Sequence, residues 1–218
     1  MGEYLGPTPL ATVERLSVYL RTLEEAKNEG LEYISSEEIG RRNGFTSAQV
    51  RKDLSCFGNF GKKGKGYHID TLIGRIKKIL GLDRRWNVAL MGLGNLGEAL
   101  VHYQGFKKSG FDIVAIFDID PKKIGKKYEG IEVYHPDKLP EVKVEKNIEM
   151  AIIAVPDKAA KASINRVIKA GIKGILNFTS VRLPISDEYI IKNVNLAAEL
   201  ETISYYLTRP DWLCRGTY

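Results

Sequence analysis

Few cysteines, few histidines and no long apolar run are found in this sequence. Of its 218 residues, 2 are cysteine and 3 are histidine. Cys56 and Cys214 have no metal-ligand spacing, and so low a cysteine content is typical of the reducing cytoplasm. No apolar stretch approaches the roughly 18 residues of a membrane-spanning helix, and residues 1–9 lack the apolar core of a signal peptide. We therefore expect a cytoplasmic protein that binds no metal and no membrane.

Acidic residues are scarce in one segment. The net charge is +6, from 33 Lys and Arg against 27 Asp and Glu. Residues 41–78 alone contain ten basic and only two acidic residues. A solvated basic face explains most such segments, but clustered positive charge also attracts a nucleic-acid backbone.

Two short helices with the same start signal lie in and just before this basic segment. Ser35 and Thr46 are predicted N-caps, and Glu38 and Gln49 complete a capping box three residues after each. A short turn containing glycine separates the two helices, and this spacing predicts a helix-turn-helix. The second helix, Ser47 to about Ser55, is the expected recognition helix. Its exposed side is predicted to present base-reading residue types. These are Ser47, Gln49, Arg51 and Lys52.

A segment rich in glycine and lysine follows. It is predicted to form a β-hairpin tip flanked by the strand residues Phe60 and Tyr67. Such a pattern also fits an exposed loop without function. Its position after a recognition helix favours the wing of a winged helix, whose lysines would contact DNA phosphates. The predicted phosphate contacts are Lys62, Lys63 and Lys65. Amphipathic helices, one beginning with Pro9 at its first position and one at 69–80, complete this domain.

The stretch from Trp86 to Leu100 carries the most informative motif. An apolar run at 88–91 predicts a buried parallel strand, followed by glycines with G-x-G-x-x-G spacing and then by good helix formers. In a nucleotide-binding βαβ unit these glycines make the tight turn, admit a pyrophosphate and let the helix pack on the strand. The start of the helix directs N–H groups and positive dipole at the phosphates. The spacing alone also fits a plain strand–turn–helix.

The residues after the glycines favour a dinucleotide. A second strand is predicted at 111–117, and Asp118 stands at its end, 21 residues after the last glycine. Asp118 can accept hydrogen bonds from an adenosine ribose and would repel a 2′-phosphate, which favours NAD over NADP. Lys122 and Lys123 weaken this preference, because basic residues here can accommodate a phosphate. Asp120, the competing acid, is expected to shape the turn.

The remaining pattern predicts an α/β domain with a parallel sheet covered on both faces. Strands are expected at 131–134, 149–155 and 173–177, with a helix at 157–170. Because ligands bind at the carboxyl ends of such strands, the strand ends are expected to line the crevice, although each also fits an ordinary turn. These lining residues are Val155, Pro156, Asn177 and Phe178. A helix at 196–207 has a wide apolar face that fits packing on its own domain or on a second subunit.

Together these stretches resemble the family of redox-sensing transcriptional repressors called Rex, over nearly the full length. The resemblance is carried by TSAQVRKDLSCFGNFGKKGKGY, LGLDRRWNVALMGLGNLGEAL, IFDIDPKKIG and NLAAELETISYYL. It implies a mainly α winged-helix domain (1–82), a Rossmann domain (83–194) and a C-terminal helix (195–218) swapped between the subunits of a homodimer. It also implies that the protein binds a palindromic DNA operator and releases it when NADH binds.

The resemblance assigns roles to single residues. Arg15 and Tyr103 match positions that link the dinucleotide site to the DNA-binding domain. Some relatives have an arginine in the glycine loop and an aspartate before the tail helix, where this chain has Asn95 and Asn195. The resemblance therefore does not carry a charge-pair switch between subunits over to this chain, in which Tyr103 can still hydrogen-bond to Asn195. The implied cofactor loop is Gly92, Leu93, Gly94, Asn95, Leu96 and Gly97. The expected apolar lining of the nicotinamide ring is Phe178 together with Leu196 of the partner subunit.

The rival prediction is an NAD-dependent dehydrogenase with a basic appendage. Hydride transfer usually needs an acid or base beside the ring, most often histidine. Only His135 is worth considering, and a surface turn is its simpler interpretation. Too little chain follows the nucleotide domain for a substrate domain, so we expect no catalytic residue and no enzyme activity. Cys56 is expected to be packed rather than reactive.

Overall fold

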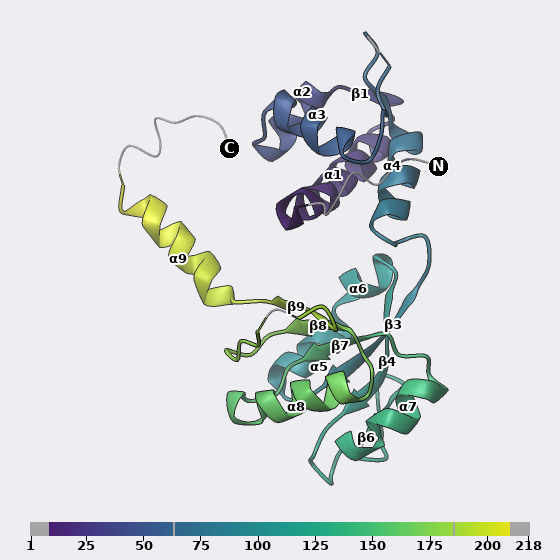
Figure 1. Ribbon diagram of the computed structural model, residues 1–218, viewed down its shortest axis with the longest axis vertical. Coiled ribbons are helices and arrows are strands. Elements are labelled where there is room, and N and C mark those ends of the chain that lie inside the picture. The colour runs from purple at the N-terminus through teal and green to yellow at the C-terminus, as the bar shows by residue number, and fades with distance from the viewer. Residues whose placement is uncertain (1–8, 63, 185, 210–218) are drawn as a thin grey trace. The chain divides into compact units, whose positions relative to one another are not determined.

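Figure 1 shows the computed structural model, which describes residues 9–62, 64–184 and 186–209. The chain divides into two compact units, one reaching to Arg84 and the other spanning Arg85–Arg209. Two residues singled out above, Lys63 and Cys214, lie outside the described residues.

The N-terminal unit is a winged helix, as predicted. Its elements are α1 (Leu10–Asn28), β1 (Tyr33–Ile34), α2 (Ser36–Asn43), α3 (Ser47–Ser55), β2 (Tyr67–His68) and α4 (Ile69–Ile79). The core between the helices is apolar and includes the fully buried Leu16, Leu23 and Ile76. Pro9 has an extended backbone and precedes α1 as its N-cap rather than forming its first helical residue.

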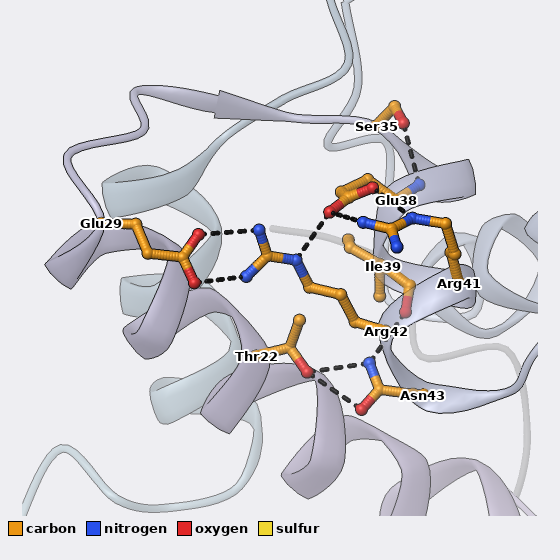
Figure 2. Close-up of polar contacts among 8 residues, drawn as sticks. All are labelled: Thr22, Glu29, Ser35, Glu38, Ile39, Arg41, Arg42 and Asn43. Atoms are coloured by element: carbon orange, nitrogen blue, oxygen red, sulfur yellow. Dashed lines mark hydrogen bonds and ion pairs between the residues drawn. The ribbon is translucent and has the colours of Figure 1, made fainter.

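An arginine that bridges two carboxylates ties α2 to the end of α1 (Figure 2). Arg42 donates to both oxygens of Glu29 at 2.8 and 2.7 Å and to Glu38 at 2.7 Å. Ser35 accepts from the Glu38 backbone N–H at 3.0 Å and so caps α2 as predicted. The Glu38 carboxylate, however, accepts from Arg41 and Arg42, and these hydrogen bonds lower the pKa of Glu38 to about 2. Ion pairs therefore take the place of the second half of the predicted capping box.

A buried carboxylate holds α3 against α1. Asp53 is 1% exposed, and it accepts from Arg15 at 2.6 and 2.8 Å and from the Tyr19 hydroxyl at 2.8 Å. The Gln49 amide also donates to Asp53, at 2.9 Å, and is half-buried. The prediction that Gln49 lies on the exposed side was wrong, because a buried charge one helical turn away requires its donor. Burial alone raises the pKa of Asp53, but the hydrogen bonds from Arg15, Tyr19 and Gln49 outweigh it and lower that pKa.

The wing pairs differently from the prediction. Tyr67 opposes Ile34 in an antiparallel pair between β2 and β1, whereas Phe60 lies in no strand and packs against the core. The hairpin closes at Lys62, whose N–H donates to the Gly66 carbonyl at 2.9 Å. Gly66 has φ +81°, and a Cβ there would lie 2.5 Å from the Ile34 carbonyl oxygen. Only glycine fits where the wing crosses β1.

The C-terminal unit is a Rossmann-type parallel sheet, as predicted. Its strands are β3 (Trp86–Met91), β4 (Phe111–Phe117), β5 (Lys127–Tyr128), β6 (Ile131–Tyr134), β7 (Met150–Ile153), β8 (Gly174–Asn177) and β9 (Ile190–Asn193). Their order is β5-β6-β4-β3-β7-β8-β9, and only β5 is antiparallel to its neighbour. The short strands β5 and β9 were not predicted.

Helices cover both faces of this sheet. They are α5 (Asn95–His102), α6 (Gln104–Lys108), α7 (Leu139–Glu145), which follows a short 3-10 turn (Pro136–Lys138), and α8 (Asp157–Lys169). Apolar residues of α7 and α8 pack with one face of the sheet, and those of α5 and α6 pack with the other. The core strand β3 is therefore buried on both sides, which explains its unbroken apolar run.

The last helix, α9 (Leu196–Leu207), has no buried residue. Five of its apolar or aromatic residues are each more than half exposed: Leu196, Leu200, Ile203, Tyr205 and Leu207. A helix with such a face is stable in water only when another surface covers it.

Cys56 is exposed, so the prediction that it is packed was wrong. Because α3 ends at Ser55, Cys56 falls in the turn that follows, with its Sγ 3.4 Å from the Lys52 carbonyl oxygen. Across the described residues, no helix is both long and apolar enough to span a membrane, and no three His, Cys, Asp or Glu side chains form a group that could hold a metal ion.

We expect Asp53→Ala to destabilise the N-terminal unit by about 3 kcal/mol at pH 7, because Arg15 and Tyr19 lose their buried acceptor. Urea unfolding followed by circular dichroism measures this change. Since the folded-state pKa of Asp53 is below its ordinary 3.8, the contribution is complete above pH 4 and is lost as the pH falls through that lower pKa. Asp70→Ala is the control, because Asp70 is exposed and pairs with the exposed Lys27 side chain in α1, and it should leave the transition nearly unchanged. Equal effects of the two variants would contradict the role of Asp53.

Candidate functional site

The turn between β3 and α5 is the first candidate site. Gly92 has φ +97°, and a Cβ there would lie 2.6 Å from the Ala154 carbonyl oxygen. A Cβ on Gly97 would lie 2.1 Å from the Gly92 carbonyl oxygen. At Gly94, by contrast, a Cβ would meet no atom within 4 Å. The fold itself therefore requires the first and third glycines, whereas the second borders open space that a ligand can enter.

The position of this turn in the sheet also suits a ligand. β3 lies between β4 and β7, so the chain leaves β3 to one side and later returns on the other. In open parallel sheets, ligands bind at the carboxyl ends of the strands where the order reverses in this way. The start of α5 adds N–H groups without partners inside the helix, which favour an anion.

Asp118, directly after β4, contacts the glycine turn. One carboxylate oxygen accepts from the Leu93 backbone N–H at 2.7 Å, and the other accepts from the Asp120 N–H at 2.9 Å. Because each carboxylate oxygen can accept about two hydrogen bonds, both retain an acceptor position for ribose hydroxyls. The Asp120 carboxylate accepts from the Lys122 N–H at 2.9 Å, so Asp120 shapes the turn as predicted.

The ends of β7 and β8 lie in the second half of the sheet. Val155 is half-buried beside Gly92, and Pro156 is exposed before α8. Asn177 is 0% exposed, and its side chain donates to the Val181 carbonyl at 2.9 Å and accepts from Thr179. Contrary to expectation, the Asn177 side chain thus organises the turn after β8 and is not presented to a ligand. Phe178 is half-buried and packs with the sheet face that α5 and α6 cover.

An acid–hydroxyl contact at this edge was missed from the sequence. Asp157, the first residue of α8, accepts from the Ser180 N–H at 2.9 Å and from its hydroxyl at 2.5 Å. The hydrogen bonds from Ser180 lower the pKa of Asp157, so the carboxylate stays ionised. The contact ties the turn after β8 to the start of α8. An acidic residue at the start of a helix was the only signal.

The residues with roles implied by resemblance are placed as follows. Asn95 and Leu96 begin α5 and are exposed. Tyr103 is the C-cap that follows α5, is 58% exposed and meets the Phe106 ring edge-on at 5.0 Å between centroids. The Asn195 side-chain oxygen accepts from two backbone N–H groups at 3.1 and 3.4 Å and caps α9.

The groove between α3 and the wing is the second candidate site. It has a volume of about 810 Å³, and Arg51, Lys62 and Lys65 all line it. These three side chains are exposed. Arg51 donates to the Ser36 hydroxyl at 3.2 Å, and the Lys65 ammonium lies 4.3 Å from the Tyr33 ring centroid. Helix and wing thus direct positive charge into one groove, which suits a nucleic-acid backbone.

Two other predicted DNA contacts lie on α3 itself. Lys52 is exposed, and Ser47 is half-buried at the start of the helix. With Gln49 held by Asp53, Arg51 and Lys52 are the predicted base readers that α3 leaves exposed.

Both units match known protein families. Residues 83–181 match a CoA binding domain, and residues 8–55 match a putative DNA-binding protein N-terminus. The chain is 48% identical over 201 residues to the redox-sensing transcriptional repressor Rex of Carboxydothermus hydrogenoformans, covering 92% of this chain and 97% of the relative. It is 43% identical over 201 residues to the repressor of the same name in Syntrophobacter fumaroxidans, covering 92% and 96%.

Solved structures give the same similarity across both units. A crystal structure of RSP in complex with β-NAD+ and operator DNA matches with a TM-score of 0.87 and 37% identity, covering 96% of this chain and 97% of that one. A crystal structure of RSP in complex with β-NADH matches with a TM-score of 0.85 and 35% identity, covering 96% and 99%. RSP is a Rex-family repressor.

We expect Gly94→Ala to fold like the unchanged protein and Gly97→Ala to unfold at a clearly lower temperature. The added methyl group meets no neighbour at position 94 but collides with the Gly92 carbonyl at position 97. Gly94→Ala should nevertheless weaken binding of NADH, measured by its fluorescence, at least about tenfold, because the methyl group occupies the space that a pyrophosphate needs. Unchanged NADH affinity in Gly94→Ala would contradict the assignment of this space to the ligand.

Proposed function

Because the chain belongs to the Rex family of redox-sensing transcriptional repressors, we propose that it releases a palindromic operator when NADH binds. As a family member, it is a DNA-binding repressor that senses the NADH/NAD ratio. The observation that carries the release mechanism is that one chain holds both a basic groove and a glycine turn with open space at Gly94. The similar RSP structures contain β-NAD+ with operator DNA in one case and β-NADH in the other.

The residues of the glycine turn fit a dinucleotide. The open space at Gly94 and the start of α5 suit the pyrophosphate, and Asp118 retains acceptor positions for the ribose. The bound nicotinamide is a cation in NAD and neutral in NADH. Phe178, together with Leu196 of the partner subunit, would line the ring with apolar surface and so disfavour the cation. Val155 and Pro156 complete the crevice wall.

The DNA contacts are assigned to the groove between α3 and the wing. Arg51 and Lys52 are the proposed base readers, since arginine and lysine pair with guanine in the major groove. Lys62 and Lys65 are the proposed phosphate contacts on the wing. Gln49 is assigned to the Asp53 network instead of to the DNA.

Three functional parts follow along the chain. Residues 1–82 would bind DNA, 83–194 would bind the dinucleotide, and 195–218 would join two subunits. The exposed apolar face of α9 supports the homodimer, because a second copy can cover it. A dimer also presents two recognition helices with the two-fold symmetry of a palindromic operator.

The dinucleotide would act here as a signal and not as a substrate. His135, the one histidine considered for hydride transfer, accepts from the Asp137 N–H at 3.3 Å and begins a 3-10 turn. It follows β6, on the β4 side of the sheet, away from β7 and β8. We therefore propose that the chain has no dehydrogenase activity, and that it acts in the cytoplasm, where operator DNA and NADH are both present.

The proposal is tested by fluorescence anisotropy with a palindromic DNA fragment selected by the protein from a random library. NADH should weaken DNA binding about 5- to 150-fold, which corresponds to a typical coupling between two sites, whereas NAD should not. Gly94→Ala serves as the control, because it should bind the same DNA and fail to respond to NADH. If no fragment binds at moderate salt while NADH is oxidised in the presence of a substrate, the dehydrogenase is the correct interpretation.

We expect Leu200→Glu to convert a dimer into monomers in sedimentation velocity and to weaken operator binding at least tenfold. A charge in the centre of the α9 apolar face cannot be buried without a partner. Val144→Glu is the matched control, because Val144 is equally apolar and 70% exposed on α7, outside the proposed interface. A wild-type chain that sediments as a monomer, or a dimeric Leu200→Glu variant, would show that α9 does not join the subunits.

A further inference from the structure

The segment after β4 holds the peptide groups on both sides of Leu93. The Leu93 N–H donates to the Asp118 carboxylate at 2.7 Å, and the Leu93 carbonyl accepts from the Lys123 ammonium. That ammonium also lies 3.6 Å from the Glu98 carboxylate in the first turn of α5. Leu93 is 2% exposed. An anion, a cation and the core therefore fix this one residue between two glycines.

We propose that Asp118 and Lys123 form a clamp on Leu93, which sets the direction of the backbone N–H groups of the glycine turn. In this clamp Lys123 is a positioning residue and not a ligand for a 2′-phosphate. The inference rests on the proposed binding of NADH at this turn. It concerns a specificity question that the sequence leaves open, because basic residues after the ribose-binding acid can also accommodate the phosphate of NADPH.

Peptide geometry connects the clamp to the ligand. In a planar trans peptide, the carbonyl of Leu93 and the N–H of Gly94 point in opposite directions. A carbonyl held by Lys123 therefore directs the Gly94 N–H to the other side of the turn. Glycines at 92 and 94 leave the backbone many conformations, and fixing one of them in advance lowers the entropy loss on binding.

The same contacts keep the Lys123 ammonium from binding the 2′-phosphate of NADPH. Its side chain is 33% exposed and has two partners, the Leu93 carbonyl and Glu98. Moving the ammonium to a 2′-phosphate would break both contacts and release the turn. The neighbouring Lys122 is exposed, and only its backbone N–H enters the turn, through Asp120. Lys122 therefore provides a matched control of equal charge one residue away.

The test compares Lys123→Met, Lys123→Arg and Lys122→Met in titrations with NADH and with NADPH. Loss of a charged hydrogen bond should weaken NADH binding about tenfold or more in Lys123→Met, and NADPH binding by the same factor. Lys123→Arg can still donate to the carbonyl and should restore NADH binding to within about threefold. Lys122→Met should change it less than about twofold. If Lys123→Met weakens only NADPH binding, Lys123 is a phosphate ligand and the clamp is wrong.

Hydrogen exchange in the ligand-free protein gives a readout independent of the proposed function. In Lys123→Met, the backbone amides of residues 92–97 should exchange faster than in the wild type, while those elsewhere exchange at an unchanged rate and the thermal midpoint is preserved. In Lys122→Met, all exchange rates should match the wild type. Unchanged exchange in residues 92–97 overturns the clamp. If the wild type binds neither dinucleotide, the proposed function fails, and the exchange comparison still decides whether the clamp exists.

Discussion

A buried carboxylate must be surrounded by donors, and in the N-terminal unit this requirement decides how α3, the proposed recognition helix, is placed. Asp53 takes hydrogen bonds from Arg15 and Tyr19 on α1 and from Gln49 on its own helix. Removal of any donor leaves part of an ion without compensation in a dry site. α3 is therefore fixed to α1 in one orientation, with Arg51 outward and Gln49 inward. If α3 binds DNA as proposed, a helix fixed in this way loses little further conformational entropy on binding.

The C-terminal unit also contains a carboxylate held by hydrogen-bond donors, but this one is less buried. Asp118 accepts two backbone N–H groups but is only half-buried, so acceptor capacity remains for a ligand. Asp53 and Asp118 therefore show two roles that an aspartate can have in this fold. Full burial with several strong donors makes Asp53 structural, whereas partial burial lets Asp118 order the glycine turn and still offer a binding surface.

Local signals in the sequence were sufficient for most of the fold. Ser35 and Thr46 cap their helices as predicted, because a cap depends only on residues three positions apart. The glycine spacing and the apolar strands likewise predicted the parallel sheet. Two of the failures, at Gln49 and Asn177, depend on a partner distant in sequence, which is Arg15 in the first case and Asn193 in the second. Gln49 turns inward because it donates to the Asp53 carboxylate, whose buried charge is compensated by Arg15. The Asn177 side chain donates to the Val181 carbonyl and to the Asn193 side chain on the neighbouring strand β9. Neither partner is visible in a periodic pattern.

The two asparagines bear on how strong the coupling between the sites can be. Asn195 uses its side-chain oxygen to cap α9, so its amide N–H groups are what it offers to Tyr103 in the proposed homodimer. Such a contact is a neutral hydrogen bond, worth about 0.5–1.5 kcal/mol, and two symmetric copies reach the roughly 1–3 kcal/mol of ordinary coupling. If Tyr103 and Asn195 meet as proposed, the response does not require a charge pair. Neutral contacts are also little affected by salt, whereas phosphate contacts weaken steeply. With asparagine at both positions, ionic strength would change the affinity for DNA far more than the response to NADH.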